Sequence, residues 1–170
     1  MEDRRIDLDA LALRSGEAER FELELVPAPP VAGGDELAFE SVPITVRIDV
    51  SRTTSGYALR LRAEAVLLAS CARCLGPARL ELTVDAREVE QGGAEDSELR
   101  CPYVSDGLLE PARWLHDAIV LSLPERILCR TDCAGLCEVC GVSLNEVDPA
   151  THTHERAPDP RFAKLRDLLD

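Results

Sequence analysis

Residues 59–84 read LRLRAEAVLLASCARCLGPARLELTV, with two alternating segments on either side of a pair of cysteines. In residues 59–67 apolar side chains alternate mostly with charged ones, and the same alternation returns in residues 80–84. A period of two with polar residues in between is typical of antiparallel strands that are buried on one face. The C-x2-C pair, Cys71 and Cys74, lies in the connection between the two segments. We therefore predict a β-hairpin whose turn carries two thiols suited to metal binding.

Two upstream segments repeat this alternation, and one downstream segment changes to helical spacing. Residues 21–25 and 42–50 have a period of two, and turn-rich stretches such as PAPPVAGGDE separate them. Residues 110–123, EPARWLHDAIVLSL, place apolar residues at helical spacing, with Trp114 as the expected core anchor. Pro111 suits a first helical turn and Pro124 ends the run. These patterns predict an α+β fold, in which a mainly antiparallel sheet over about residues 1–105 packs against a helix.

The rest of the chain reads as a small appendage to this sheet. Cysteines and polar residues dominate from about residue 125 to 157, and the stretch DPRFAKLRDLL then reads as a short amphipathic helix. Asp159 is its candidate N-cap. We expect residues 1–124 to form an antiparallel β-sheet domain with a C-terminal helix. Residues 125–170 form a cysteine-rich, zinc-binding segment with a closing helix.

Four of the seven cysteines fall within twelve residues, in LCRTDCAGLCEVCG. The N-terminus lacks the apolar core of a signal peptide, and no window approaches the length of a membrane span. We therefore expect a cytoplasmic protein, where clustered cysteines favour metal binding over disulfides. Cys101 stands apart from the cluster and is expected to be a buried thiol. The expected cofactor is about one structural zinc ion per chain.

The spacing leaves three ligand sets open, in this order of preference. The first is the local set Cys129, Cys133, Cys137 and Cys140. The second joins the C-x2-C of Cys137 and Cys140 to the H-x-H of His152 and His154. The third joins Cys71 and Cys74 to Cys137 and Cys140 across the fold. All three sets supply the four nitrogen or sulfur ligands that close a structural zinc site.

Charge is unevenly distributed along this acidic chain. The net charge of −13 and a pI near 4.7 argue against a general nucleic-acid-binding surface. Six arginines and two acidic residues between residues 47 and 80 give that window +4, which leaves −17 for the remainder. We predict that RNA or partner contacts gather in this window, and we name the following arginines for them: Arg60, Arg62, Arg73 and Arg79.

Four stretches in this order resemble the YceD family, which is associated with accumulation of large-subunit ribosomal RNA. They are CARC at residues 71–74, WLHDAIVLSLPERILC at 114–129, GLCEVCGVSLN at 135–145 and DPRFAKL at 159–165. The resemblance implies a non-enzymatic role in the synthesis, processing or stability of 23S rRNA. Its implied partner is large-subunit rRNA or a precursor particle. With the acidic balance, this favours contact through a basic ribosomal protein.

Enzyme functions find little support in the sequence. It has no glycine-rich phosphate loop and no H-E-x-x-H pair. A thioredoxin-like C-x-x-C would open a helix, whereas Cys71 and Cys74 lie between two predicted strands. We expect no small-molecule substrate and no membrane association. The alternative function is a zinc-stabilised protein-interaction adaptor without a role in RNA metabolism.

Overall fold

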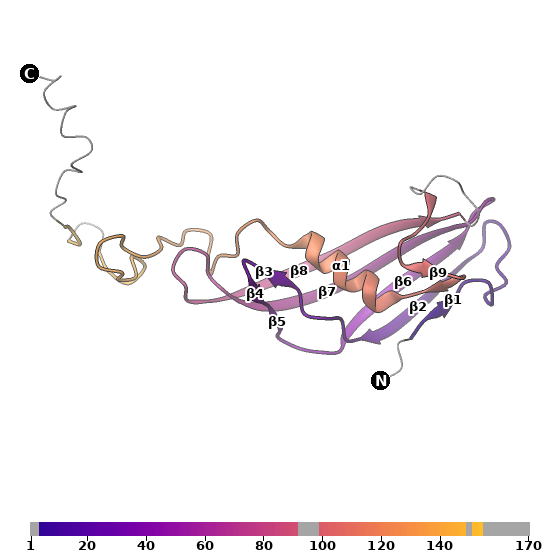
Figure 1. Ribbon diagram of the computed structural model, residues 1–170, viewed down its shortest axis with the longest axis horizontal. Helices are drawn as coiled ribbons and strands as arrows, with labels where there is room; N and C mark the ends of the chain where they lie inside the picture. Colours follow the sequence, from indigo (N-terminus) through magenta and orange to yellow (C-terminus); the bar gives the residue numbers. More distant parts are fainter. Residues whose placement is uncertain (1–3, 92–98, 149–150, 155–170) are drawn as a thin grey trace, which may run out of the picture.

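A computed structural model describes residues 4–91, 99–148 and 151–154 (Figure 1). Its main feature is an antiparallel sheet of long strands: β2 (Ala18–Leu25), β6 (Ile44–Arg52), β7 (Tyr57–Ser70) and β8 (Pro77–Glu90). One helix, α1 (Pro111–Ser122), packs on this sheet. The predicted α+β fold with a mainly antiparallel sheet is confirmed. The predicted closing helix lies outside the described residues.

The four strands lie in chain order across the sheet. Short turns join β6 to β7 and β7 to β8, whereas residues 26–43 connect β2 to β6. β2 pairs with β6, β6 with β7 and β7 with β8, and every pairing is antiparallel. The β7–β8 hairpin is the longest unit and runs in unbroken register from Tyr57 opposite Glu90 to Ser70 opposite Pro77. Beyond the end of β6, the short β5 (Ala38–Phe39) pairs with the same edge of β7.

Five more short strands form two small accessory sheets. β1 (Ile6–Asp7), β10 (Leu108–Leu109) and β9 (Val104–Ser105) form one of them. β3 (Val31–Ala32) and β4 (Asp35–Glu36) form the other as a small hairpin. The buried Tyr57 hydroxyl donates a 2.9 Å hydrogen bond to the Leu8 carbonyl, which ties the N-terminal segment to the start of β7.

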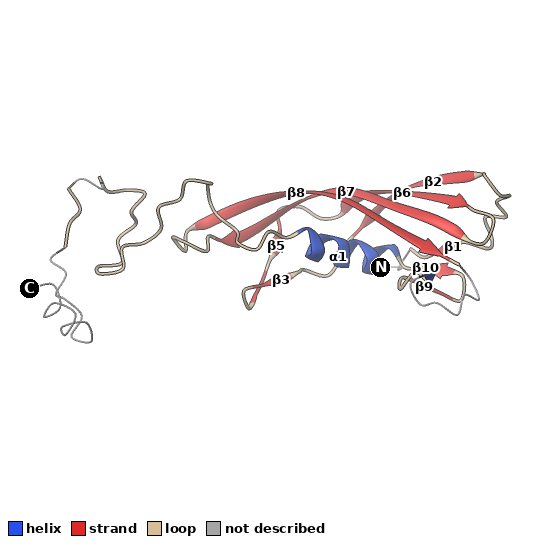
Figure 2. Cartoon of the chain, turned by 90° about the horizontal axis from the view of Figure 1, so that it is seen from above, coloured by secondary structure: helices blue, strands red, loops and turns tan. Residues whose placement is uncertain are grey.

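The hydrophobic core lies on one face of the sheet, which α1 covers (Figure 2). Alternate residues of β6 and β7 are buried there, among them Val46, Ile48 and Leu61 at 0% exposure. From the helix, Trp114 is 1% exposed and stacks on Tyr103 with ring centroids 6.0 Å apart. The other face of the sheet carries the polar residues of the alternation.

The helix begins and ends where its prolines predict. Pro111 occupies the first turn, and the residue that caps the C-terminus, Leu123, is extended and precedes Pro124. In the described part of the chain, no helix is long and apolar enough to cross a membrane. After α1 the chain runs beyond the end of the sheet, past the β7–β8 turn (Figure 1).

Candidate metal centres

The turn between β7 and β8 is a tight cysteine knuckle. The Cys71 N–H donates to the Gly76 carbonyl at 2.8 Å, and the Leu75 N–H donates to the Cys71 carbonyl at 3.0 Å. These bonds curl the chain so that the Arg73 N–H points at Cys71 Sγ, 3.4 Å away. Both thiols of the C-x2-C motif therefore lie at the tip of the hairpin.

The segment that follows α1 docks against this knuckle. The Ala72 N–H donates to the Ile127 carbonyl at 2.8 Å, and the Arg73 guanidinium donates to the Cys133 carbonyl at 2.8 Å. Gly135 passes so close that an added Cβ would lie 3.2 Å from the Arg73 carbonyl oxygen, and its φ of +82° also favours glycine. These contacts bring Cys129 and Cys133 to the tip of the hairpin.

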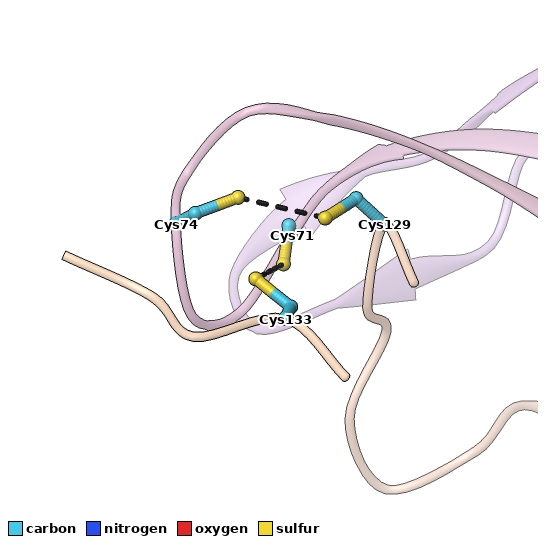
Figure 3. Close-up of side chains that lie close together, drawn as sticks. All are labelled: Cys71, Cys74, Cys129 and Cys133. Atoms are coloured by element: carbon cyan, nitrogen blue, oxygen red, sulfur yellow. Dashed lines mark hydrogen bonds between the residues drawn. The ribbon is translucent and has the colours of Figure 1, made fainter. Parts of the chain in front are cut away.

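Four cysteines thus converge in what we name the inner cluster: Cys71, Cys74, Cys129 and Cys133 (Figure 3). Their sulfurs all lie within 4.8 Å of one another, with 3.8 Å between Cys71 and Cys133 and 3.7 Å between Cys74 and Cys129. A disulfide would need sulfurs about 2.05 Å apart. A tetrahedral zinc with Zn–S bonds of about 2.3 Å separates its sulfurs by about 3.8 Å. The cluster could therefore hold a metal ion of this kind.

The thiols of the inner cluster differ in acidity. A hydrogen bond from the Cys74 backbone N–H lowers the pKa of Cys71 to about 6. Desolvation raises the pKa of Cys129 to about 12, and the neighbouring thiols push it the same way. Four sulfurs this close cannot all ionise unless a cation balances them. A bound dication would remove this conflict, since metal binding deprotonates thiol ligands.

Asn145 supports the inner cluster from behind. Its side-chain nitrogen donates to Cys133 Sγ at 3.4 Å, and this hydrogen bond is the largest cause of the lowered pKa of Cys133. Its carbonyl oxygen accepts from the Ala134 N–H at 2.8 Å and from Arg130 at 2.9 Å. Sequence reasoning did not assign Asn145 a role, although it ends the GLCEVCGVSLN stretch.

A second knuckle repeats the backbone pattern of the first. The Cys137 N–H donates to the Val142 carbonyl at 2.8 Å, and the Gly141 N–H donates to the Cys137 carbonyl at 2.9 Å. In each knuckle the first cysteine bonds to residues four and five positions later, and the residue at the fourth position has a positive φ. That residue is Gly141 at +73° here and Leu75 at +60° in the first knuckle.

Two histidines close on this second knuckle to form what we name the outer cluster: Cys137, Cys140, His152 and His154. Its four donor atoms also lie within 4.8 Å of one another. Cys140 Sγ is 3.5 Å from His152 Nε2, which is 3.0 Å from His154 Nε2. Hydrogen bonds from the Cys140 backbone N–H and from His152 lower the pKa of Cys137 to about 6. This cluster too could hold a metal ion.

The structure divides the preferred ligand set between these two clusters. Cys129 and Cys133 face the hairpin turn, because the segment after α1 hydrogen-bonds to it, while Cys137 and Cys140 lie on their own knuckle. The second predicted set, Cys137 and Cys140 with His152 and His154, does lie together. The third predicted set does not, since Cys71 and Cys74 lie beside Cys129 and Cys133. The predicted set of four local cysteines therefore does not surround one point.

Cys101 and His116 belong to neither cluster. Cys101 is 3% exposed, in line with the buried thiol expected from the sequence, and burial raises its pKa to about 11. His116 lies on α1, where its Nδ1 is 2.8 Å from the Ala28 carbonyl oxygen. Cys101 and His116 can therefore serve as control positions for substitutions of the six cysteines and two histidines in the clusters.

The arginines predicted to contact RNA or a partner are engaged within the chain. Arg60 forms a two-pronged ion pair with Asp85 at 2.7 and 2.8 Å. Arg62 pairs with Asp49. Arg79 pairs with Glu40 at 2.7 and 2.8 Å and with Glu81, and Arg73 bonds to the Cys133 carbonyl. Their positive charge is therefore largely balanced where it lies.

Arg47 is the exception on the polar face. It stands opposite Arg62 and Glu22 in the sheet register, and its side chain forms no ion pair or hydrogen bond with the described residues. It lines an open hollow of about 660 Å³ on the polar face, together with Arg62 and Asp85. Sequence reasoning counted Arg47 in the positive window but did not single it out.

Residues 59–169, which include both clusters and nearly all of the β7–β8 hairpin, match the family model described as large ribosomal RNA subunit accumulation protein YceD. The chain belongs to this family. An uncharacterized protein of Mycobacterium tuberculosis is 32% identical over 174 residues, covering 96% of this chain and 80% of the relative. An uncharacterized protein of Mycobacterium leprae is 30% identical over 132 residues, covering 75% of this chain and 59% of the relative. No solved structure matches the chain.

Proposed function

We propose that this protein is a non-catalytic factor that supports the accumulation of large-subunit ribosomal RNA. The observation that carries the proposal is the family match, which begins in β7 and spans the knuckle hairpin and both clusters. The process is that of the family description. The finer mechanism proposed here is contact with a precursor of the large subunit.

The proposed cofactor is zinc, and in the inner cluster its role is structural. Four cysteine ligands close a tetrahedral site and leave no coordination position for a reacting water molecule. The ion would join the tip of the β7–β8 hairpin to the segment after α1, with Asn145 as the partner that orients Cys133. Such a centre holds a surface in shape and does no chemistry on a substrate.

The contact we propose is with a basic ribosomal protein of the precursor particle. The net charge of −13 attracts a basic partner and repels a bare phosphate backbone. The ion pairs of Arg60, Arg62 and Arg79 favour the same choice, because phosphates would have to compete with carboxylates already in place. A protein partner can instead pair its own charged side chains with the alternating positive and negative charges on the polar face of the sheet.

Depletion of the protein in its native host tests the proposal. The expected result is a fall in 23S rRNA relative to small-subunit rRNA, with precursors of the large subunit visible in a sucrose gradient. Wild-type protein should restore both, as should the Cys101→Ala variant, while a Cys129→Ser/Cys133→Ser variant should not. Unchanged rRNA levels after depletion would leave the adaptor function without an RNA role as the better explanation.

A further inference from the structure

The outer cluster gathers donor atoms that the inner cluster does not use. Two of the chain's three histidines and a complete C-x2-C knuckle meet at one point. The clusters share no ligand, although only three residues separate Cys133 from Cys137. The folded-back segment fixes their relative position, since the Leu144 N–H donates to the Gly135 carbonyl at 2.8 Å. The outer cluster is therefore a separate arrangement beside the inner one.

The distances in the outer cluster suit a bound cation. A tetrahedral zinc with Zn–N bonds of about 2.0–2.1 Å and Zn–S bonds of about 2.3 Å puts its nitrogens about 3.4 Å apart and nitrogen and sulfur about 3.6 Å apart. The corresponding separations here are 3.0 Å between the two Nε2 atoms and 3.5 Å between Cys140 Sγ and His152 Nε2. Two imidazole nitrogens facing each other can share only one proton, whereas a cation can bind both.

The second knuckle supplies an independent reason. It repeats the hydrogen bonds of the first, in which an N–H group points at the leading sulfur. Hydrogen bonds from backbone N–H groups favour the thiolate, which is the form that binds metal. The backbone of each knuckle thus favours a thiolate at its leading cysteine, Cys71 or Cys137.

We infer that the outer cluster is a second metal centre, a Cys2His2 site for a divalent cation of the zinc class. The chain then binds two ions, one with four thiolates and one with two thiolates and two neutral imidazoles. The mixed centre balances the charge of its ion, while the four-thiolate centre carries a net charge of −2.

The two centres differ in their access to solvent. In the inner cluster Cys71 and Cys133 are 0% and 1% exposed, Cys74 is half-buried and Cys129 is exposed. In the outer cluster Cys140 and His154 are exposed, and the other two ligands are half-buried. A chelator reaches the outer ion first, because two of its four ligands are exposed and none of them lies in the hairpin turn that holds Cys71 and Cys74. The outer centre therefore exchanges its metal faster than the inner centre does.

Metal counting and timed release on the full-length protein test this inference. Protein purified without added metal should contain two zinc ions per chain by elemental analysis. A chromogenic chelator should withdraw them in two phases of equal amplitude. The His152→Ala/His154→Ala variant should contain one zinc and lack the fast phase. His116→Ala and Cys101→Ala, which remove a histidine and a cysteine outside both clusters, should keep two ions and both phases.

The His152→Ala/His154→Ala variant should keep the fold of the wild type, because His154 is exposed and His152 half-buried. Cys137→Ser/Cys140→Ser is the second test of the same site and should also lose the fast phase. One zinc in the wild-type protein, or two ions released in a single phase that the histidine variants do not alter, would overturn the inference. These readouts do not involve rRNA, so they separate this inference from the proposed function.

Discussion

Leu75 holds a backbone conformation that leucine seldom adopts, at the position that Gly141 occupies in the second knuckle. Its φ is +60° and its side chain is 70% exposed, so little buried surface compensates for the strain. We predict that Leu75→Gly leaves the free energy of unfolding unchanged or raises it by up to about 1 kcal/mol, because relief of strain offsets the added entropy of the unfolded chain. Chemical denaturation of the metal-loaded protein measures this.

The converse substitution should act in the opposite direction. Gly141→Leu forces a side chain into the left-handed region, at a cost of about 1–2 kcal/mol. No atom lies within 4 Å of a Cβ built there, so a destabilisation would come from the backbone conformation and not from a clash. Equal stability of Gly141→Leu and the wild type would show that the knuckles do not need this conformation.

Asn145 should be needed for tight metal binding by the inner cluster. Asn145→Ala removes the hydrogen bond to Cys133 Sγ together with those to Ala134 and Arg130. Loss of a partner that orients a ligand typically lowers metal affinity about 10–100-fold. Competition with a chelator of known affinity measures the change, and Glu146→Gln next to it serves as the control. An unchanged affinity of Asn145→Ala would contradict this role.

Asp49 should contribute to stability in a pH-dependent way. Hydrogen bonds from Arg20 and then Arg62 hold the pKa of this carboxyl below its ordinary value. A depressed pKa in the folded state gives stability that is present above the unfolded-state pKa, near 3.9, and is lost as the pH falls through the folded-state value. Asp49→Asn should therefore be less stable than the wild type at pH 7, and the difference should shrink as the pH falls from about 3.9 through the lower folded-state pKa of Asp49. Urea denaturation across this range tests it.

Residue identity alone could predict cysteine chemistry but not cysteine pairing. The outer cluster was open to prediction because all its ligands are local: Cys140 and His152 are 12 positions apart in the sequence and the two histidines are two positions apart. The inner cluster needs the docking of residues after α1 onto the hairpin, through bonds such as that from Ala72 to Ile127. Those are backbone contacts between distant segments, and side-chain type does not report them.

At the scale of the element, the β7–β8 hairpin explains what periodicity can and cannot predict. The alternation at residues 59–67 and 80–84 located both strands, but each extends over 14 residues. The ends lack a clear alternation, since Leu67, Leu68 and Ala69 follow one another, and only the pairing across the hairpin continues the strands. The two-residue strands carry no period and were not predicted.

Metal removal should loosen the segment after α1 and the hairpin turn, and leave the sheet folded. The sheet has its own core on the face that α1 covers, whereas residues 125–148 contain no long strand or helix. Chelation should therefore raise hydrogen exchange in residues 125–148 and at the hairpin turn, and leave the centres of β6 and β7 protected. Hydrogen exchange with mass spectrometry tests this, and global loss of protection on chelation would refute it.

At the scale of the whole molecule, the polar face offers a test of how the protein meets its partner. Arg47→Glu alters the charge without breaking an ion pair among the described residues, whereas Arg60→Glu breaks the pair with Asp85. If the arginines of this face contact phosphates of the precursor particle, both variants should bind more weakly, with a reduced dependence on salt. If the contact is a basic protein, as proposed, neither variant should bind more weakly than the wild type. Only Arg60→Glu should also lose stability. Co-sedimentation at low and high salt measures the binding.

If both variants bind as strongly as the wild type, the contact lies on the acidic remainder of the surface. That remainder carries the excess negative charge, and a basic protein would meet it there. Charge reversal at acidic positions away from the sheet would then be the next comparison.

The two clusters also differ in the sequence separation of their ligands. In the inner cluster the paired sulfurs are 62 and 55 residues apart, and the intervening loop contains β8 and α1. Closing such a loop before the sheet exists costs entropy that a short loop does not. The outer cluster spans a short stretch near the end of the chain, so its ion can bind while the protein is still unfolded. The inner ion can bind only after the hairpin and the helix have formed, so its binding is a late step of folding.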